Sequence, residues 1–211
     1  MGNWESAFEL WRFIVEDFWQ TTCETHCTKH EIPNLENNVF EEIKMKKLLA
    51  VAFLALTSCV GIPENIKPVT GFDVEKYLGT WHEIARLDHS FERGLTQISA
   101  EYSKRDDGSI KVINRGYNAE NSEWKEAEGW AYFVDAPTTA YLKVAFFRPF
   151  YGSYIVFDLG DNYQYSLISG PDKSYFWILA RTPTIDEQLK ETLVKKAQQL
   201  GFDTSKLIYA K

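Results

Sequence analysis

The sequence has little cysteine, only short apolar runs and no excess of basic residues. Three cysteines occur among 211 residues, too few for a fold held together by disulfides. The longest unbroken apolar run is Leu48–Leu56, nine residues, which is too short to cross a bilayer as a helix. The formal net charge is −7, so no extended basic surface is available to neutralise phosphates, and no nucleic-acid partner is expected.

A short segment, Met45 to Cys59, has the arrangement of an export signal. Lys46 and Lys47 precede the apolar run, and Leu56-Thr57-Ser58-Cys59 ends it with small residues before a cysteine. This ending resembles the lipobox of bacterial lipoproteins. The resemblance implies that residues 45–58 are a signal peptide and that a lipidated Cys59 becomes the mature N-terminus. It also implies attachment to a membrane through Cys59. Because Val60, and not Asp, follows the cysteine, the expected location is the outer membrane, on its periplasmic side.

Residues 1–44 differ from the rest of the chain. Aromatic and aliphatic residues recur there at helical spacing, so an amphipathic helix that lies on a membrane or binds a partner is one interpretation. The other, which the position of the signal favours, is that Met45 is the true start. Cys23, His26, Cys27 and His30 would all fall on one face of a straight helix. That placement does not surround a tetrahedral ion, so no metal site is expected.

The mature chain from Cys59 contains 18 basic and 21 acidic residues and is nearly neutral. Residues 59–70, with Pro63 and Pro68, are predicted to be an extended lipidated tether with a reach of roughly 35–40 Å. Residues 71–211 are predicted to form one domain, in which short apolar or alternating runs are separated by turn residues. The predicted strands are Trp81–Leu87, Thr96–Ser103, Ile110–Tyr117, Glu126–Val134, Ala140–Phe147, Ser153–Leu159, Tyr163–Ser169 and Tyr175–Arg181.

One helix is predicted after the strands, over about residues 184–200. Thr184 and Glu187 have the spacing of a capping box, and Gly201 is placed to end the helix. The apolar stripe consists of Ile185, Leu189, Leu193, Ala197 and Leu200. Leu207-Ile208-Tyr209 reads as a short final strand. Eight strands followed by one helix favour an all-β fold, either an antiparallel up-and-down barrel or a sandwich.

Three motifs in this order resemble those of the lipocalin family. Gly79-Thr80-Trp81 matches the family's Gly-x-Trp motif, Asp161-Asn162-Tyr163 is similar to the second motif, and Arg181 stands where the third motif places its arginine. Residues 77–86 are similar to the bacterial outer-membrane lipocalins related to apolipoprotein D. The resemblance implies an eight-stranded β-barrel with the helix packed on it. It also implies that Gly79, Trp81 and Arg181 are structural residues of the barrel floor, with the guanidinium of Arg181 across the indole of Trp81.

Alternation along the strands then predicts which side chains face the interior. With the resemblance, it indicates that these residues line a ligand cavity, although a completely filled interior is the alternative. The predicted lining residues are Glu83, Ala85, Val112, Asn114, Leu142, Val144, Phe146, Tyr154, Val156 and Trp177. Arg86 and Arg93 are expected near the mouth, where they either meet a charged headgroup or are simply solvated.

No catalytic, phosphate-binding or cofactor motif occurs, so an enzyme is not expected and no cofactor is predicted. The family implies a hydrophobic ligand, and the subgroup a fatty acid or a lysophospholipid. The leading hypothesis is therefore a membrane-anchored lipid-binding protein that stores or transports these ligands in the cell envelope. Two alternatives stay open: an envelope protein that uses the barrel as a structural or interaction platform, and a lipocalin-like enzyme. The sequence does not predict an oligomeric state.

Overall fold

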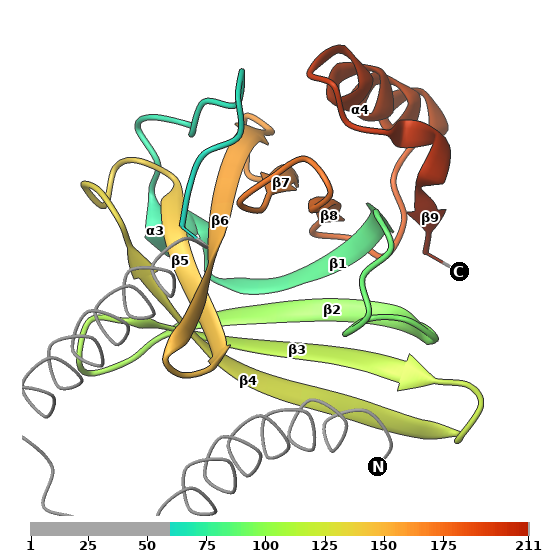
Figure 1. Cartoon of the computed structure of the whole chain (residues 1–211), viewed down its shortest axis with the longest axis horizontal. Helices are drawn as coiled ribbons and strands as arrows, with labels where there is room; N and C mark the ends of the chain where they lie inside the picture. The colour runs from blue at the N-terminus through green and yellow to red at the C-terminus, as the bar shows by residue number, and fades with distance from the viewer. Residues whose placement is uncertain (1–59, 211) are drawn as a thin grey trace, which may run out of the picture. The chain divides into compact units, whose positions relative to one another are not determined.

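The computed structural model describes residues 60–210, which form a closed antiparallel β-barrel with one helix and a short final strand after it (Figure 1). The predicted barrel is thus confirmed, and the sandwich alternative is wrong. The strands are β1 (Gly79–Arg86), β2 (Leu95–Lys104), β3 (Ile110–Asn118), β4 (Glu123–Phe133), β5 (Tyr141–Phe147), β6 (Phe150–Leu159), β7 (Tyr165–Ser169), β8 (Phe176–Ala180) and β9 (Ile208–Tyr209). The helices are α3 (Val74–Tyr77), α4 (Glu187–Gln199) and the 3-10 turn η1 (Thr204–Lys206). No helix within residues 60–210 is long and apolar enough to cross a membrane.

Strand β1 closes the barrel because it pairs along both of its edges. One edge pairs with β8 over His82–Arg86. The other edge pairs first with β2, over Gly79–His82, and then with β9, over Ala85 and Arg86. Beyond His82, β2 therefore no longer pairs with β1, and β9 occupies that edge. The strand order is β2-β3-β4-β5-β6-β7-β8-β1-β9, with the additional β1–β2 pairing.

Strand alternation separates the apolar residues into two cores. On β8, Leu179 and Trp177 belong to the core inside the barrel, whereas Phe176 and Ile178 belong to a second core that includes residues of α4. Leu193 and Ala197 are the buried residues of α4. The helix thus covers the outer face of the β1, β7 and β8 region with the apolar stripe that the sequence predicts.

Helix α4 begins later than predicted, because Asp186 and not Thr184 caps it. The Asp186 carboxylate accepts hydrogen bonds from the backbone N–H groups of Gln188 and Leu189, at 2.9 and 3.3 Å. At the other end Gly201 adopts φ +88°, and Phe202 N–H donates to the Ala197 carbonyl at 3.2 Å. This is a Schellman ending, which requires the left-handed backbone that glycine adopts most easily.

The segment before α3 is not the free tether that its composition suggests. The Ser153 hydroxyl on β6 accepts from Gly61 N–H at 2.8 Å and donates to the Gly61 carbonyl at 2.7 Å. Val69 N–H donates to the Val156 carbonyl at 2.9 Å, and Ile66 is buried in the outer core. The chain runs beside β6 because apolar side chains and main-chain groups of this segment both find partners there (Figure 1). From Gly61 onward, this segment is therefore packed against the barrel and is not a free extended chain.

The barrel floor is built on Trp81, whose side chain is fully buried. The guanidinium carbon of Arg181 lies 4.0 Å from the centroid of the Trp81 ring, as the resemblance implies. Arg181 also donates to the carbonyls of Thr80 at 2.9 Å and Lys76 at 2.6 Å. Gly79 adopts φ +91°, and a side chain there would start 3.5 Å from Arg181 Nη1. Glycine thus provides both the backbone turn and the room for the arginine.

Replacing Trp81 by alanine should lower the free energy of unfolding by about 3–5 kcal/mol, because it empties the floor and leaves Arg181 without its stacking partner. Urea unfolding followed by circular dichroism would measure the change. Trp124→Ala is the matched control, since Trp124 is 59% exposed. A loss no larger than that of the control would contradict the structural role of Trp81.

Candidate ligand cavity

The part of the barrel that lies away from the Trp81 floor contains a cavity of about 480 Å³, which is within the usual volume range of small-molecule sites. Its lining comes from β1, β2, β3, β5, β6, β7 and β8 and from the loops at the open end. Most of the predicted lining residues are in place. These are Glu83, Val112, Asn114, Val144, Phe146, Tyr154 and Trp177.

Leu142 and Val156 face the interior but lie outside the cavity lining. They are 5% and 0% exposed and belong to the inner core with Trp81. Leu142 stands near the start of β5 and Val156 well along β6, away from the β5–β6 hairpin. The lower part of the barrel is therefore filled with side chains, and the cavity occupies only the part nearer the mouth. The predicted ligand cavity is thus present near the mouth, and the alternative of a filled interior holds for the lower part of the barrel.

Ala85 is a correction, because it lies outside the barrel in the core that includes residues of α4. A β-bulge shifts the register, so that Glu83 pairs with Leu179 but Ala85 pairs with Ile178. Ile84 and Ala85 consequently both belong to the outer core, and strict alternation fails beyond Glu83. Two adjacent apolar residues in an otherwise alternating strand were the available signal for this bulge.

The same bulge turns Arg86 inward, where sequence reasoning had placed it at the wet rim. Arg86 is 4% exposed, and its register partner on the adjacent strand β8 is Trp177, which lines the cavity. Its guanidinium bonds to the Glu83 carboxylate and donates to the Glu92 carbonyl at 3.1 Å. Its Nε lies 3.8 Å from Glu92 Oε2. Arg93, by contrast, is exposed and forms an ion pair with Asp88 at 2.6 Å.

Glu83 and Glu92 are buried acids with weakened ionisation. Burial, and then the nearby charge of Glu92, raise the pKa of Glu83 to about 7, although Arg86 opposes the shift. Burial also raises the pKa of Glu92, against the hydrogen bond from Trp177 Nε1 at 3.0 Å. Glu83 Oε2 and Asn114 Oδ1 have no hydrogen-bond partner among the described residues. The wall of the cavity thus holds polar oxygens whose bonding is incomplete.

Tyrosines form the base of the cavity. The Tyr154 hydroxyl lies 2.7 Å from that of Tyr77 and 2.8 Å from that of Tyr102. Tyr77 also reaches Ser166 Oγ at 3.2 Å, and its carbonyl accepts from Trp81 Nε1 at 2.8 Å. Burial raises the pKa of Tyr77 to about 12, so it stays neutral at physiological pH. This network joins the cavity to the floor without placing a charge between them.

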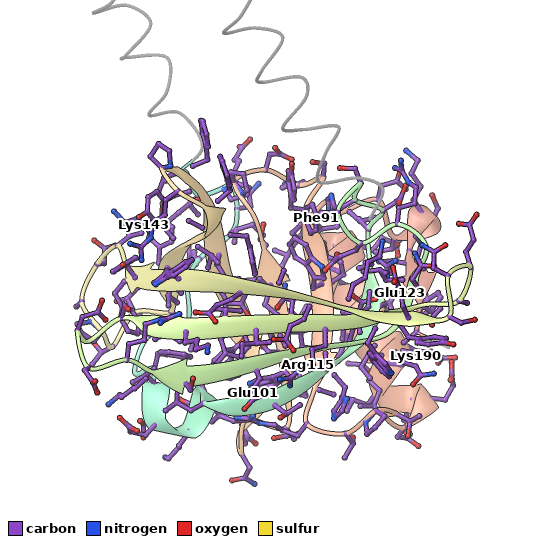
Figure 2. The ribbon with its side chains drawn as sticks, turned by 90° about the horizontal axis from the view of Figure 1, so that it is seen from below. Phe91, Glu101, Arg115, Glu123, Lys143 and Lys190 are labelled. Carbon is purple, nitrogen blue, oxygen red and sulfur yellow. The ribbon has the colours of Figure 1, made fainter. Side chains whose placement is uncertain are left out.

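Aromatic rings surround the mouth. The His89 ring stacks on Tyr175 at 4.4 Å between centroids and lies 5.3 Å from Phe91, which projects from the β1–β2 loop (Figure 2). Burial lowers the pKa of His89, which favours its neutral form. On the opposite hairpin Phe150 lines the cavity and is 49% exposed. The rim therefore offers apolar rings to whatever enters.

Comparison with known proteins identifies the family. The model of the lipocalin-like domain matches residues 72–211. The outer membrane lipoprotein Blc of Vibrio cholerae is 54% identical over 162 residues, which cover 76% of this chain and 95% of the relative. The Blc of Escherichia coli K12 is 52% identical over 147 residues, 70% of this chain and 83% of the relative.

This chain is a lipocalin. Insecticyanin from Manduca sexta shares the fold at 24% identity, with a TM-score of 0.54, covering 72% of this chain and 87% of that one. The predicted location is confirmed by the curated relatives: this lipocalin is an outer-membrane lipoprotein. The expectation that it is not an enzyme is confirmed too, because the family and these relatives are binding proteins.

The position of Cys59 lies outside the described residues, as do residues 1–44 and the predicted signal at 45–58. Their assignments stay predictions. Within residues 60–210 no group of three or more His, Cys, Asp or Glu side chains could hold a metal ion.

The stability of this lipocalin should fall as the pH rises through the Glu83 titration. Between about pH 4.5 and pH 7 the folded chain keeps a proton on Glu83 that the unfolded chain has lost, so deprotonation costs folded stability in this window. Glu83→Gln should remove much of this slope between about pH 4.5 and pH 7 in urea unfolding. Glu101→Gln, which removes an acid paired with Arg115 on the outer face, should keep it. An unchanged slope in Glu83→Gln would refute the assignment.

Proposed function

We propose that this lipocalin is a membrane-anchored carrier that stores or transports fatty acids or lysophospholipids in the cell envelope. The cavity is the observation that carries the proposal. The cavity has room for part of an acyl chain, its wall is largely apolar, and exposed aromatic rings lie at its entrance. Burial of an acyl chain there would contribute about 0.8 kcal/mol for each methylene group removed from water.

The segment after the predicted lipidation site supports delivery from a membrane. Gly61 is held to Ser153, which lines the cavity, and Cys59 is two residues upstream. Two residues extend the chain by no more than about 7 Å, so acyl groups on Cys59 would be attached close to this side of the cavity. Phe147 and Phe150, both exposed and stacked at 6.2 Å, lie on the same β5–β6 hairpin as Ser153. We therefore propose that the ligand-binding barrel is held beside the membrane that supplies its ligand.

The cavity favours a lipid carrier over the alternative of a structural or interaction platform. A barrel used only as a rigid surface does not need an interior volume, and the rings at the rim would expose apolar area without a use. An exhaustive lipid extract of the native protein, followed by mass spectrometry, would name the ligand. Recovery of one lipid class near one equivalent supports the carrier, whereas a protein that contains and binds no lipid supports the platform.

Filling the cavity should weaken ligand binding. In the full chain carrying Cys59→Ala, Val144→Trp should lower the affinity for a lysophospholipid at least about tenfold, because loss of two buried methylene contacts already has that effect. Isothermal titration calorimetry below the micellar concentration would measure it. Val134→Trp is the matched control at an exposed position. Equal affinities in both variants would contradict binding in this cavity.

Cys59→Ala should also release the protein from membranes. Without the thiol no acyl groups can be attached, so the mature protein should fractionate with the soluble envelope proteins and lose the acyl mass. Membrane fractionation with intact mass spectrometry would show both changes. Cys23→Ala is the control, since that cysteine precedes the predicted signal. Persistent membrane attachment of the Cys59 variant would refute the anchor.

A further inference from the structure

Charge is distributed unevenly around the cavity wall. Among residues 60–210, the charged side chains that line the cavity are Glu83 and Glu92, and no lysine, arginine or histidine does so. Arg86, which bonds to Glu83, lines an adjoining cleft of about 230 Å³ beside the β1–β2 loop and β9, and Glu83 lines this cleft too. The cavity lining therefore contains both carboxylates, whereas the guanidinium that they share lines the adjoining cleft.

The cluster also has more acid than base. Glu83 and Glu92 share one guanidinium, so one negative charge is left when both acids are ionised. Glu83 is 3% exposed, and its Oε2 has no hydrogen-bond partner among the described residues. A buried charged oxygen without a partner is costly, and a donor that carries positive charge would remove that cost.

Three aromatic rings surround this acidic wall. Trp177 donates to Glu92 at 3.0 Å, and its ring lies 6.5 Å from Phe91 and 6.2 Å from Tyr175. All three rings line the cavity. Aromatic faces beside carboxylates are the surroundings in which proteins bind ammonium groups. The rings and glutamates provide no favourable partner for a carboxylate headgroup, because the two glutamates would repel its negative charge.

We propose that Glu83, Glu92 and the rings of Phe91, Tyr175 and Trp177 form a subsite for the ammonium group of an amphiphile whose chain occupies the cavity. The inference rests on the proposed function and narrows it. Lipids with an amine-bearing headgroup bind, and fatty acid anions bind more weakly. Because Glu83 Oε2 is an acceptor without a partner among the described residues, an ammonium with N–H groups binds more tightly than a quaternary one.

Four probes with the same tail test this subsite: dodecylammonium, dodecyltrimethylammonium, dodecanol and dodecanoate. They are titrated below their micellar concentrations, at about pH 8 and low salt, where Glu83 is largely ionised, into the full chain carrying Cys59→Ala. Dodecylammonium should bind at least about tenfold more tightly than dodecanoate, the effect of one charge-assisted hydrogen bond. Dodecyltrimethylammonium should fall between dodecylammonium and dodecanol.

Glu83→Gln and Glu92→Gln should each reduce the advantage of dodecylammonium over dodecanol, and together they should abolish it. Glu101→Gln is the matched control, because Glu101 pairs with Arg115 on the outer face of β2 and β3 (Figure 2). It should leave the order of the four probes unchanged.

Dodecanoate binding as tightly as dodecylammonium to the wild-type cavity would overturn the subsite, and so would an advantage that survives the double variant. In both cases the binding of dodecanol would still support a lipid carrier. Failure of all four probes, dodecanol included, would overturn the carrier itself and the subsite with it. The wild-type order decides the question even if a glutamine variant does not fold.

Discussion

The stacking of Arg181 on Trp81 is the contact on which the rest of this barrel depends. It joins the end of β8 to the start of β1, and the guanidinium also holds carbonyls of α3 and β1. An arginine spread across a buried indole closes the floor with a charged group that still reaches the surface. Above it the Tyr77, Tyr102 and Tyr154 hydroxyls satisfy one another. Because Arg181 and Trp81 close this end of the barrel and the tyrosine layer above them is uncharged, the entrance lies at the opposite end.

The bulge after Glu83 decides the chemistry of the cavity wall. It moves Ala85 to the outer core and brings Arg86 to the inner side of the strand beside Trp177. Without that extra residue, alternation would point Arg86 to the outside, and Glu83 would be buried without a cation. With it, the acid can be buried at the cost of a pKa raised to about 7. A local change of register thus sets the electrostatics that the proposed ammonium subsite uses.

The segment between the predicted anchor and the barrel links location to function. Its hydrogen bonds to Ser153 and Val156 hold it against β6, so the chain does not leave the barrel at the floor. Gly61, two residues after the predicted lipidation site, is thereby held on the same β5–β6 hairpin as the exposed rings of Phe147 and Phe150. A carrier that takes an amphiphile tail first into an apolar space, with its cationic head among glutamates and rings, would suit such an arrangement.

Much of the fold could be predicted from the sequence. Turn residues between alternating runs mark the strands, the stripe from Leu189 to Ala197 marks α4, and the motif residues Gly79, Trp81 and Arg181 mark the floor. These signals are local or follow from the resemblance. The cavity residues were predicted only as far as alternation stays regular, which is why Val112 and Val144 were placed correctly while Ala85 was not. Leu142 and Val156 show a second limit, since parity tells which side a residue faces but not whether its neighbours fill the space.

By itself, then, the sequence determined the order of strands and helix through spacing and turn residues, and it indicated the compartment and the closing pair at the floor through its resemblance to known motifs. Only the tertiary structure decided how deep the cavity is, that the segment from Gly61 is bound to β6, and that Arg86 is buried between two glutamates. These depend on a register shift and on contacts between residues far apart in the chain, which no local pattern specifies.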